Sequence, residues 1–447
     1  MKKRKKKLIF AVTEDTERYM TFYVYTLGCK VNHYESGAIA KEFEKNGAFE
    51  AKDGKTCDVY IVNTCAVTEE SVRKSKQAVR RAKRNNPSAV TVVCGCAPHS
   101  DVSLAESLPE ADIIVGNSEK SRLFELVCEF FKTGERIVEI GDISKEKKID
   151  MLKAGKREKT RGVLKIQDGC NNFCSYCVIP FTRGRIRSKD IESAVDEAKE
   201  LVCEGCKEIV LTGIHLDNYG KETGKFDLCS LLLRLDAIEG LERVRLSSLE
   251  PVFITEENVN KIKNVKNLCR HFHLSLQSGC EKTLRAMNRH YTPEEFLSAV
   301  ELLRRTFDGC SVTTDIITGF PGETDEDFCI SLEFAKKVGF SKVHVFPYSE
   351  RKGTVAAAME NRVPKEIREE RCKKMIAACA EGEENYRKEL IGKVKSVLFE
   401  TEENGFYSGY TEEYVEVRVK TDKNISSLIL PVKITDVCKN VTTGVLA

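Results

Sequence analysis

The sequence predicts a mixed α/β fold in three parts: an N-terminal doubly wound parallel-sheet domain, a central partial (β/α)6 barrel and a small C-terminal β-barrel. Short apolar runs alternate with amphipathic segments in two series, which is typical of parallel sheets covered by helices. After the second series and a long helical segment, only short alternating runs remain, which indicates a small all-β module. The 447 residues also exceed what one hydrophobic core usually serves.

The first series is expected to form a domain over residues 20–143. Gly47 ends its first helix, and Glu69 and Glu70 favour the start of its second helix. A polar, lysine-rich stretch at 144–160 is predicted to be a linker. The strands are predicted at 22–27, 58–63, 89–93 and 112–115, and the helices at 34–46 and 68–86.

The second series is expected over residues 161–389, followed by the β module over 390–447. Six strands are predicted for the partial barrel, at 163–167, 208–212, 243–247, 271–276, 311–318 and 342–346, with a long helix at 364–389. The C-terminal strands are predicted at 393–399, 405–410, 414–420 and 427–434.

Composition narrows the class of protein. Charged residues make up 32% of the chain with a net charge of +3, so overall charge does not indicate a polyanionic partner. The basic run Lys2–Lys7 precedes an apolar stretch too short for a signal peptide, and no apolar run is long enough to span a membrane. Nineteen cysteines without a secretory signal indicate reduced thiols and metal ligation. The protein is therefore expected in the cytoplasm, without a membrane partner.

Three cysteines directly follow the first predicted strand of the central barrel. Cys170, Cys174 and Cys177 form a CxxxCxxC motif. Three thiolates on one short loop bind three irons of a [4Fe–4S] cluster and leave the fourth iron open to a cofactor or substrate. A zinc site would need a fourth ligand, commonly from a second CxxC pair, and no such pair follows nearby. The motif predicts an iron–sulfur cluster that supports chemistry.

Cysteines also follow three successive strands of the N-terminal domain. Cys29 follows the first strand, Cys65 the second, and the pair Cys94 and Cys96 the third. Strands of a parallel sheet all finish at the same edge, where ligands bind, so these thiols are expected to converge. They predict a second cluster held by three cysteines.

The CxxxCxxC motif after the first strand of a partial barrel resembles the radical S-adenosylmethionine (SAM) superfamily. The resemblance implies that SAM binds the open iron and that reduction cleaves it to a 5′-deoxyadenosyl radical. It also places Tyr176 near the SAM adenine. The Gly-Gly-Glu sequence of the superfamily is absent at the second strand, so no carboxylate partner is assigned to the SAM amino group. Further candidate SAM-binding residues lie in segments at or after strands, where ordinary turn chemistry is the alternative for each: Thr212, Gly213, Ser247, Gln277 and Asp315.

From about Met20 nearly the whole chain resembles the methylthiotransferases, through the loops Tyr25–Ser36 and Val62–Thr68. The sequences of these two loops look most like those of the branch that acts on N6-threonylcarbamoyladenosine of tRNA. The resemblance assigns Cys96 as the third auxiliary ligand, whereas Cys94 stands where the family usually has threonine and remains a possible surrogate. It implies that one SAM methylates a sulfur at the auxiliary cluster of Cys29, Cys65 and Cys96, and that the other SAM yields the radical that abstracts the hydrogen at carbon 2. A flavodoxin or ferredoxin-like donor would supply the electrons.

The resemblance therefore implies a transferase that converts N6-threonylcarbamoyladenosine at position 37 of tRNA into its 2-methylthio derivative. Methylthiolation of isopentenyladenosine or of a ribosomal-protein aspartate is the alternative within the family, although the loop around the first cysteine favours neither. A non-catalytic iron–sulfur sensor that binds RNA is the alternative outside enzymes, and the motif that binds SAM disfavours it.

Two features bear on RNA. The segment 390–447 resembles the TRAM domain, and Phe406, Tyr407, Tyr410 and Tyr414 are candidates for stacking bases, although alternation predicts that half of them fill the barrel interior. The helix at 68–86 carries seven cations after Glu70, which form either a solvated face or a phosphate contact. They are Arg73, Lys74, Lys76, Arg80, Arg81, Lys83 and Arg84.

Overall fold

The computed structural model describes residues 12–13, 16–17, 19–101, 103–149, 153–154, 160–438 and 440–447. The basic run at 2–7 and residues 150–152 and 155–159 of the predicted linker lie outside the described residues. The chain divides into two compact units, each discontinuous in sequence. The first contains the described residues up to 154 together with 167–171 and 177–189, and the second contains the rest. Among the described residues, no helix combines the length and apolarity that crossing a membrane requires.

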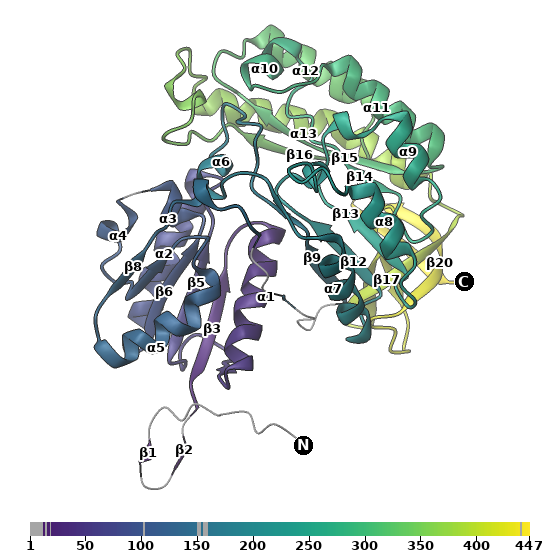
Figure 1. Ribbon diagram of the computed structural model, residues 1–447. Coiled ribbons are helices and arrows are strands. Elements are labelled where there is room, and N and C mark those ends of the chain that lie inside the picture. The colour runs from purple at the N-terminus through teal and green to yellow at the C-terminus, as the bar shows by residue number, and fades with distance from the viewer. Residues whose placement is uncertain are drawn as a thin grey trace. The chain divides into compact units, whose positions relative to one another are not determined.

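The first unit is built on a six-stranded parallel sheet with helices on both faces (Figure 1). Helices α1 (Lys30–Lys45) and α5 (Leu123–Thr133) pack on one face, and α2 (Glu69–Asn85), α3 (Ala97–Ser100) and α4 (Leu104–Ser107) contribute to the apolar cluster of the other. The predicted doubly wound domain is confirmed. The strand order is β4 (Phe49–Glu50), β3 (Thr21–Thr26), β5 (Val59–Thr64), β6 (Val90–Gly95), β7 (Ile113–Val115) and β8 (Ile137–Glu139).

The strand order reverses direction once, between β3 and β5. Strand β4 follows β3 in the chain but lies on its outer side, so the chain then continues in the opposite direction across the sheet. In doubly wound sheets, ligands bind beyond the carboxyl ends of the strands at such a switch point. Every residue of β5 and β6 is buried, as expected for central strands covered on both faces. Helix α2 begins after Thr68, whose side chain accepts a hydrogen bond from the Ser71 amide.

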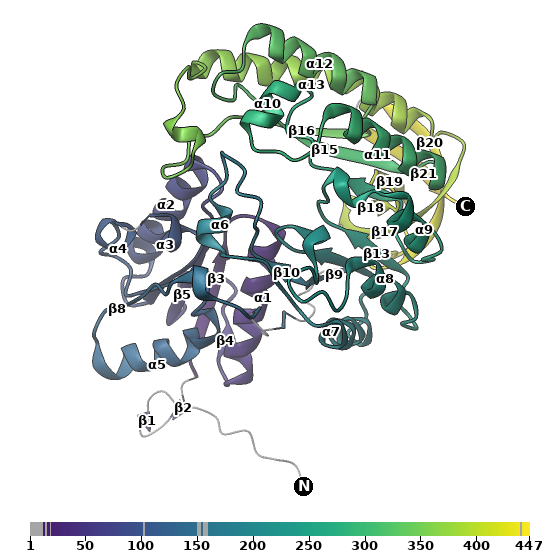
Figure 2. The same ribbon diagram turned by 45° about the horizontal axis from the view of Figure 1, so that its top comes forward.

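The second unit contains the partial barrel, with a large apolar core between its strands and the surrounding helices (Figure 2). Two three-stranded parallel sheets are joined by the parallel bridges Val244–Leu268 and Leu249–Leu274, so six strands follow one another in chain order. The predicted partial (β/α)6 barrel is confirmed. Its strands are β9 (Arg161–Lys165), β12 (Glu208–Thr212), β13 (Arg243–Leu246), β14 (His271–His273), β15 (Ser311–Thr318) and β16 (Lys342–Pro347).

In the part of the second unit that the structure describes, seven α-helices follow or connect these strands. The long helix α13 begins at Lys365 and ends at Lys388, close to the predicted bounds. Strand β14 is shorter than predicted, and Gln277, a little beyond its end, takes a left-handed backbone with φ +68°. The other helices are α7 (Ile191–Cys203), α8 (Leu228–Asp236), α9 (Glu256–Ile262), α10 (Glu281–Ala286), α11 (Pro293–Thr306) and α12 (Asp325–Val338).

The C-terminal strands close into a small barrel, as predicted. The order around the barrel is β17-β18-β19-β21-β20, and Val397, Phe399 and Val432 belong to its fully buried core. Strand β21 is not predicted from the sequence, because its threonines and glycine interrupt the apolar alternation. The strands are β17 (Val394–Glu403), β18 (Phe406–Thr411), β19 (Glu416–Lys420), β20 (Ile429–Cys438) and β21 (Val441–Leu446).

Candidate functional site

The structure places Cys29, Cys65 and Cys96 together at the carboxyl edge of the first unit's sheet. Cys29 immediately precedes α1, Cys65 immediately follows β5, and Cys96 follows β6 and precedes α3. A Cβ atom on Gly28 would lie 2.9 Å from Cys65 Cβ and 3.1 Å from Cys65 Sγ, so only glycine lets the two loops approach this closely. Burial raises the pKa of Cys65, and the neighbouring Cys96 and Cys29 raise it further.

Buried amides hold the cysteine loops in register. Asn32 Nδ2 donates to the carbonyl oxygens of Leu27 and Thr64, at 2.8 Å each. Asn63 Nδ2 in turn donates to the Asn32 carbonyl at 2.9 Å, and Thr64 Oγ1 donates to the Cys94 carbonyl at 2.6 Å. These bonds connect the loops that carry all three thiols, so the thiol positions are fixed by the fold.

Cys94 occupies a different environment from the three edge cysteines. Its side chain is fully buried in the apolar cluster that contains Ile39 and Leu126 from the helices α1 and α5. Burial raises the pKa of this thiol to about 12. Side chains alternate along a strand, and Cys94 therefore packs in the core, which argues against its role as a surrogate ligand.

A buried group of charges lies beside the edge cysteines. The fully buried Arg183 donates to Glu35 Oε1 at 2.8 Å, to Asp168 Oδ1 at 3.1 Å and to Asn32 Oδ1 at 2.6 Å. Lys120 Nζ donates to the same Glu35 carboxylate. Burial disfavours the charged guanidinium, but the charges of Cys96, Glu35 and Asp168 outweigh it and raise the pKa of Arg183. A permanent cation is therefore held near Cys96.

Asn117 connects this edge to the segment after the CxxxCxxC motif. Its Nδ2 lies 3.8 Å from Cys96 Sγ and donates to the Thr182 carbonyl at 2.6 Å. Its backbone amide donates to His99 Nε2 at 2.9 Å. Burial and the nearby Lys120 and Arg183 lower the pKa of His99 to about 4, so the imidazole is neutral near pH 7 and accepts this bond.

The CxxxCxxC cysteines are distributed over both units, and all three are partly buried. In the first unit, the Cys170 amide donates to the Gly184 carbonyl at 3.0 Å. Gly169, at φ +72°, lets this turn form, because a Cβ atom there would lie 1.9 Å from the Arg185 carbonyl oxygen. Cys177 precedes the short helix α6 (Ile179–Thr182).

In the second unit, Cys174 is contacted by an arginine that the sequence analysis did not identify. Arg289 Nη1 lies 3.3 Å from Cys174 Sγ, and its Nη2 lies 2.8 Å from Glu250 Oε1. The arginine side chain is only 6% exposed. Burial disfavours its charge, but Tyr291, Tyr176, Glu250 and Cys174 raise the pKa of Arg289 well above its usual value. A charged donor is therefore held against the sulfur.

Glu250 is the centre of a buried polar group. Asn172 Nδ2 donates to it at 2.9 Å, and His215 Nε2 lies 3.5 Å from its other oxygen. Burial alone would raise its pKa, but His215, Arg289 and Asn172 lower the pKa of Glu250 to about 2. The ligand atoms of His215, Asp217 and Glu250 all lie within 4.8 Å of one another. Arg289 already balances the negative charge of Glu250. An ion-pair network therefore explains why these three side chains lie so close together.

The remaining candidate SAM residues lie along the barrel strands of the second unit. Thr212 ends β12 and Gly213 follows it, while Ser247 directly follows β13. The Gln277 amide donates to the Asp315 carbonyl at 2.9 Å, which brings these two candidates together. The Asp315 carboxylate faces His273 Nε2 at 3.3 Å. Tyr176 packs edge-on against Phe320, with ring centroids 6.5 Å apart.

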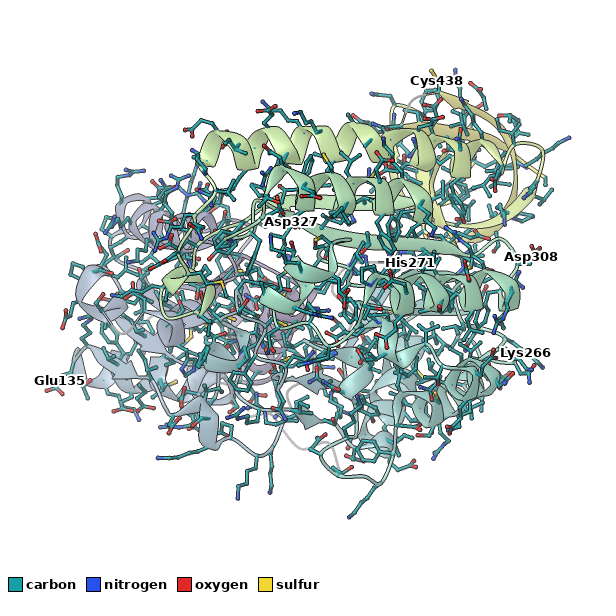
Figure 3. All side chains as sticks on the ribbon, turned by 90° about the horizontal axis from the view of Figure 1, so that it is seen from above. Glu135, Lys266, His271, Asp308, Asp327 and Cys438 are labelled. Atoms are coloured by element: carbon teal, nitrogen blue, oxygen red, sulfur yellow. The ribbon has the colours of Figure 1, made fainter. Side chains whose placement is uncertain are left out.

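Two of the four candidate RNA-stacking aromatics are used inside the second unit. Tyr410 and Tyr414 stack on each other at 4.8 Å, and the guanidinium of Arg161 lies over both rings. The Arg245 guanidinium lies 4.7 Å from the centroid of the Tyr414 ring. The Tyr414 ring also packs against His271 on β14, and His271 is labelled in Figure 3. These contacts dock the C-terminal barrel onto the (β/α) barrel, and the stacking of bases on the two partly buried rings stays a prediction.

The other two aromatics differ in exposure. Tyr407 is 9% exposed and belongs to the core of the small barrel, as alternation predicts for half of the set. Phe406 is 42% exposed and has Lys420 Nζ 5.7 Å from its ring centroid. Phe406 is therefore the most exposed of the four and lies next to a cation.

Comparison with known proteins agrees with this geometry. The radical SAM superfamily model matches residues 164–335, and a model described as uncharacterized protein family UPF0004 matches residues 21–116. The structure of the methyltransferase TsrM from Kitasatospora setae, with cobalamin and a [4Fe-4S] cluster bound, is similar with a TM-score of 0.57 over 76% of this chain and 77% of that chain. At 15% identity this likeness concerns the fold alone. Fold and motif together define the class of radical SAM proteins.

Relatives that match nearly the full length of the chain define its family more narrowly. Threonylcarbamoyladenosine tRNA methylthiotransferase MtaB of Bacillus subtilis is 39% identical over 93% of each chain, and MtaB of Aquifex aeolicus is 36% identical over 90% of this chain and 98% of its own. The tRNA-2-methylthio-N(6)-dimethylallyladenosine synthase of Clostridium tetani is 34% identical over 96% of each chain. The chain therefore belongs to the methylthiotransferase family of radical SAM enzymes, and the resemblance found in the sequence is confirmed.

Proposed function

We propose that this protein converts N6-threonylcarbamoyladenosine at position 37 of tRNA into 2-methylthio-N6-threonylcarbamoyladenosine by radical SAM chemistry. The observation that carries the proposal is the convergence of Cys29, Cys65 and Cys96 at the switch point of the first unit's sheet, in a chain whose other unit is a radical SAM barrel. The relatives named for this nucleoside support the choice of substrate.

The residues at both cysteine sites fit iron–sulfur clusters. Each set supplies three thiols, none of them in a disulfide, and each has an arginine nearby that would offset the negative charge of cluster-bound thiolates. Cys29, Cys65 and Cys96 would hold the auxiliary [4Fe–4S] cluster, and Cys170, Cys174 and Cys177 would hold the cluster that binds SAM. When bound, the clusters supply the reductive cleavage of SAM and a site for the sulfur that is methylated and transferred.

The chain's own residues position these groups. Arg183 and Lys120 neutralise Glu35 next to Cys96, while Asn32 fixes the loop that carries Cys29. Arg289 holds a charged donor against Cys174 and is itself fixed by Glu250. We assign Tyr176, Thr212, Gly213, Ser247, Gln277 and Asp315 to SAM binding because they lie along and beyond the strands of the barrel that carries Cys174.

The partners and the compartment follow from the same proposal. An adenosine in the anticodon loop is unpaired, so it reaches a site without opening a duplex. Residues 20–143 would hold the auxiliary cluster, 144–160 would link it to the radical SAM domain at 161–389, and 390–447 would contact RNA. Electrons would come from a flavodoxin or ferredoxin-like donor. The nineteen cysteines, none of them in a disulfide, support a reducing compartment such as the cytoplasm.

Nucleoside mass spectrometry of total tRNA tests the proposal. Cells lacking the gene are expected to lose the 2-methylthio-threonylcarbamoyl nucleoside and to accumulate its precursor, and the intact gene is expected to restore it. Loss of the 2-methylthio-isopentenyl nucleoside instead would transfer the assignment to that substrate. An unchanged tRNA profile would contradict the proposal and direct the search to the ribosomal-protein aspartate.

A further inference from the structure

A basic groove of about 560 Å³ lies on the first unit, between strand β3 and helix α2. It is lined by Tyr25 and Leu27 from the β3 side and, among others, by the exposed side chains of Lys74, Arg81 and Arg84 from α2. The groove therefore combines an aromatic ring, an apolar side chain and several cations within one feature.

The topology of the sheet explains why this floor is open. Helix α1, which follows β3, packs on one face of the sheet, and α2, which follows β5, packs on the other. On the α2 face, β3 lies beyond the strands β5 and β6 that α2 contacts, so Tyr23 and Tyr25 stay partly exposed there. The switch in strand order thus leaves two partly exposed tyrosines beside a basic helix.

Most cations of α2 already have acidic partners, which the sequence did not show. Lys76 pairs with Asp101 at 3.1 Å and Lys83 with Asp112 at 2.8 Å, both from outside the helix. Arg73, Lys74 and Arg80 also have a carboxylate oxygen within 4 Å, from Glu70 or Glu110. No acidic partner is found for Arg81 or Arg84 among the described residues, and both line the groove. The Arg81 guanidinium lies 5.4 Å from the centroid of the Tyr25 ring.

The groove leads to the auxiliary cysteines. Leu27 is two residues before Cys29, and its backbone amide donates to the Asn63 carbonyl at 2.9 Å, beside the loop of Cys65. A chain segment lying along Tyr25 and Leu27 would therefore run toward the edge where the three thiols converge.

We infer that this groove binds a single-stranded segment of the tRNA substrate, with phosphates on Arg81 and Arg84 and a base against Tyr25. Unpaired cations attract phosphate, and an aromatic ring stacks any base, which together are the requirements for binding single-stranded RNA. An acidic protein segment would use the cations but would gain little from the partly exposed Tyr25 ring. This inference rests on the proposed function and adds a site on the first unit to the RNA contacts expected of the C-terminal barrel.

The test uses the full-length, cluster-loaded protein and unmodified substrate tRNA. Arg81→Gln and Arg84→Gln are each expected to weaken binding and to reduce the slope of log K against log salt by about 0.7, and Arg81→Lys should restore that slope. Tyr25→Ala is expected to weaken binding about tenfold with the slope unchanged. Arg73→Gln is the matched control, because it removes one cation from the same helix outside the groove, where Glu70 already pairs with it.

Three outcomes separate the groove from the proposed function. If the wild-type protein modifies tRNA and the groove variants bind tRNA like Arg73→Gln, the groove assignment is overturned and the function stands. If wild-type protein binds no tRNA at all, the proposed function fails and the groove assignment with it. Unchanged iron content and unchanged SAM cleavage without tRNA in the groove variants, together with weaker tRNA binding, support the inference.

Discussion

Arg289 holds its guanidinium 3.3 Å from the sulfur of Cys174 and 2.8 Å from a carboxylate oxygen of Glu250. One buried side chain therefore links a proposed cluster ligand to the polar group of His215, Asp217 and Asn172. The contact explains how a charged donor is kept in place next to the Cys174 sulfur, because the carboxylate fixes the arginine from the other side.

Replacing Arg289 by Met is expected to destabilise the protein by about 3 kcal/mol, since Glu250 would remain buried without its main cation. SAM cleavage should fall more than iron content. Thermal unfolding, iron analysis and product analysis measure the three effects, and Arg285→Gln, which removes an exposed cation on α10, is the control. Wild-type unfolding and wild-type SAM cleavage in Arg289→Met would show that the contact is incidental.

Replacing Arg183 by Met is expected to affect the auxiliary site selectively. Glu35 and Asp168 would lose a shared cation in a buried region, at a cost of about 3 kcal/mol. The variant should lose up to half of its iron and its methylthiotransferase activity, and it should keep SAM cleavage. Iron analysis with a SAM-cleavage assay measures this, with the exposed Arg122→Gln as the control. Equal loss of both cluster signals would argue against a local effect.

Stability should depend on pH through His99, whose pKa is lowered to about 4 in the folded protein. The unfolded chain binds the proton first as the pH falls from about 6.5, so His99 favours the folded state above that pH and loses this contribution as the pH falls toward 4. The loss amounts to about 3 kcal/mol. Unfolding measured across this range should show a smaller slope for His99→Gln than for wild type. Parallel curves for His99→Gln and wild type would contradict the prediction.

The aromatics of the C-terminal barrel should separate into two classes. Tyr414→Ala is expected to lower stability by about 2 kcal/mol because Arg161 and Arg245 lose the ring between them. Phe406→Ala should leave stability unchanged, because the ring is 42% exposed, and should weaken tRNA binding. Thermal unfolding and a tRNA-binding titration measure the two properties. Weaker tRNA binding without any stability loss in Tyr414→Ala would reverse the assignment.

Strands with continuous apolar runs were predictable, because buried parallel strands are apolar on both faces, as in β5 and β6. The prediction that Cys29, Cys65 and Cys96 lie at one edge of the sheet followed from the same strands, because parallel strands all end at that edge. The short strands β4 and β8 were missed, since two or three residues carry no periodicity, and with β4 the exact switch point was missed.

The polar contacts around the cysteines could not be predicted. Arg183 reaches Glu35 across 148 positions of the chain, and Arg289 reaches Cys174 across 115, so neither pairing leaves a local pattern. The asparagines beside the cysteines, Asn32 in the first turn of α1 and Asn63 near the end of β5, are the signal in the sequence that points to these contacts. The roles of Tyr410 and Tyr414 likewise depend on arginines from β9 and β13.

The central claim is that the chain holds two clusters at two separate sets of three cysteines. The most direct measurement compares iron content, SAM cleavage and tRNA methylthiolation in two triple variants, with Cys94→Ala as a control that should retain its iron. Replacing Cys170, Cys174 and Cys177 with Ala should leave about half the iron and abolish SAM cleavage, whereas replacing Cys29, Cys65 and Cys96 should leave about half the iron, preserve SAM cleavage and abolish methylthiolation. Loss of all iron in either variant, or methylthiolation without the second set, would contradict the account.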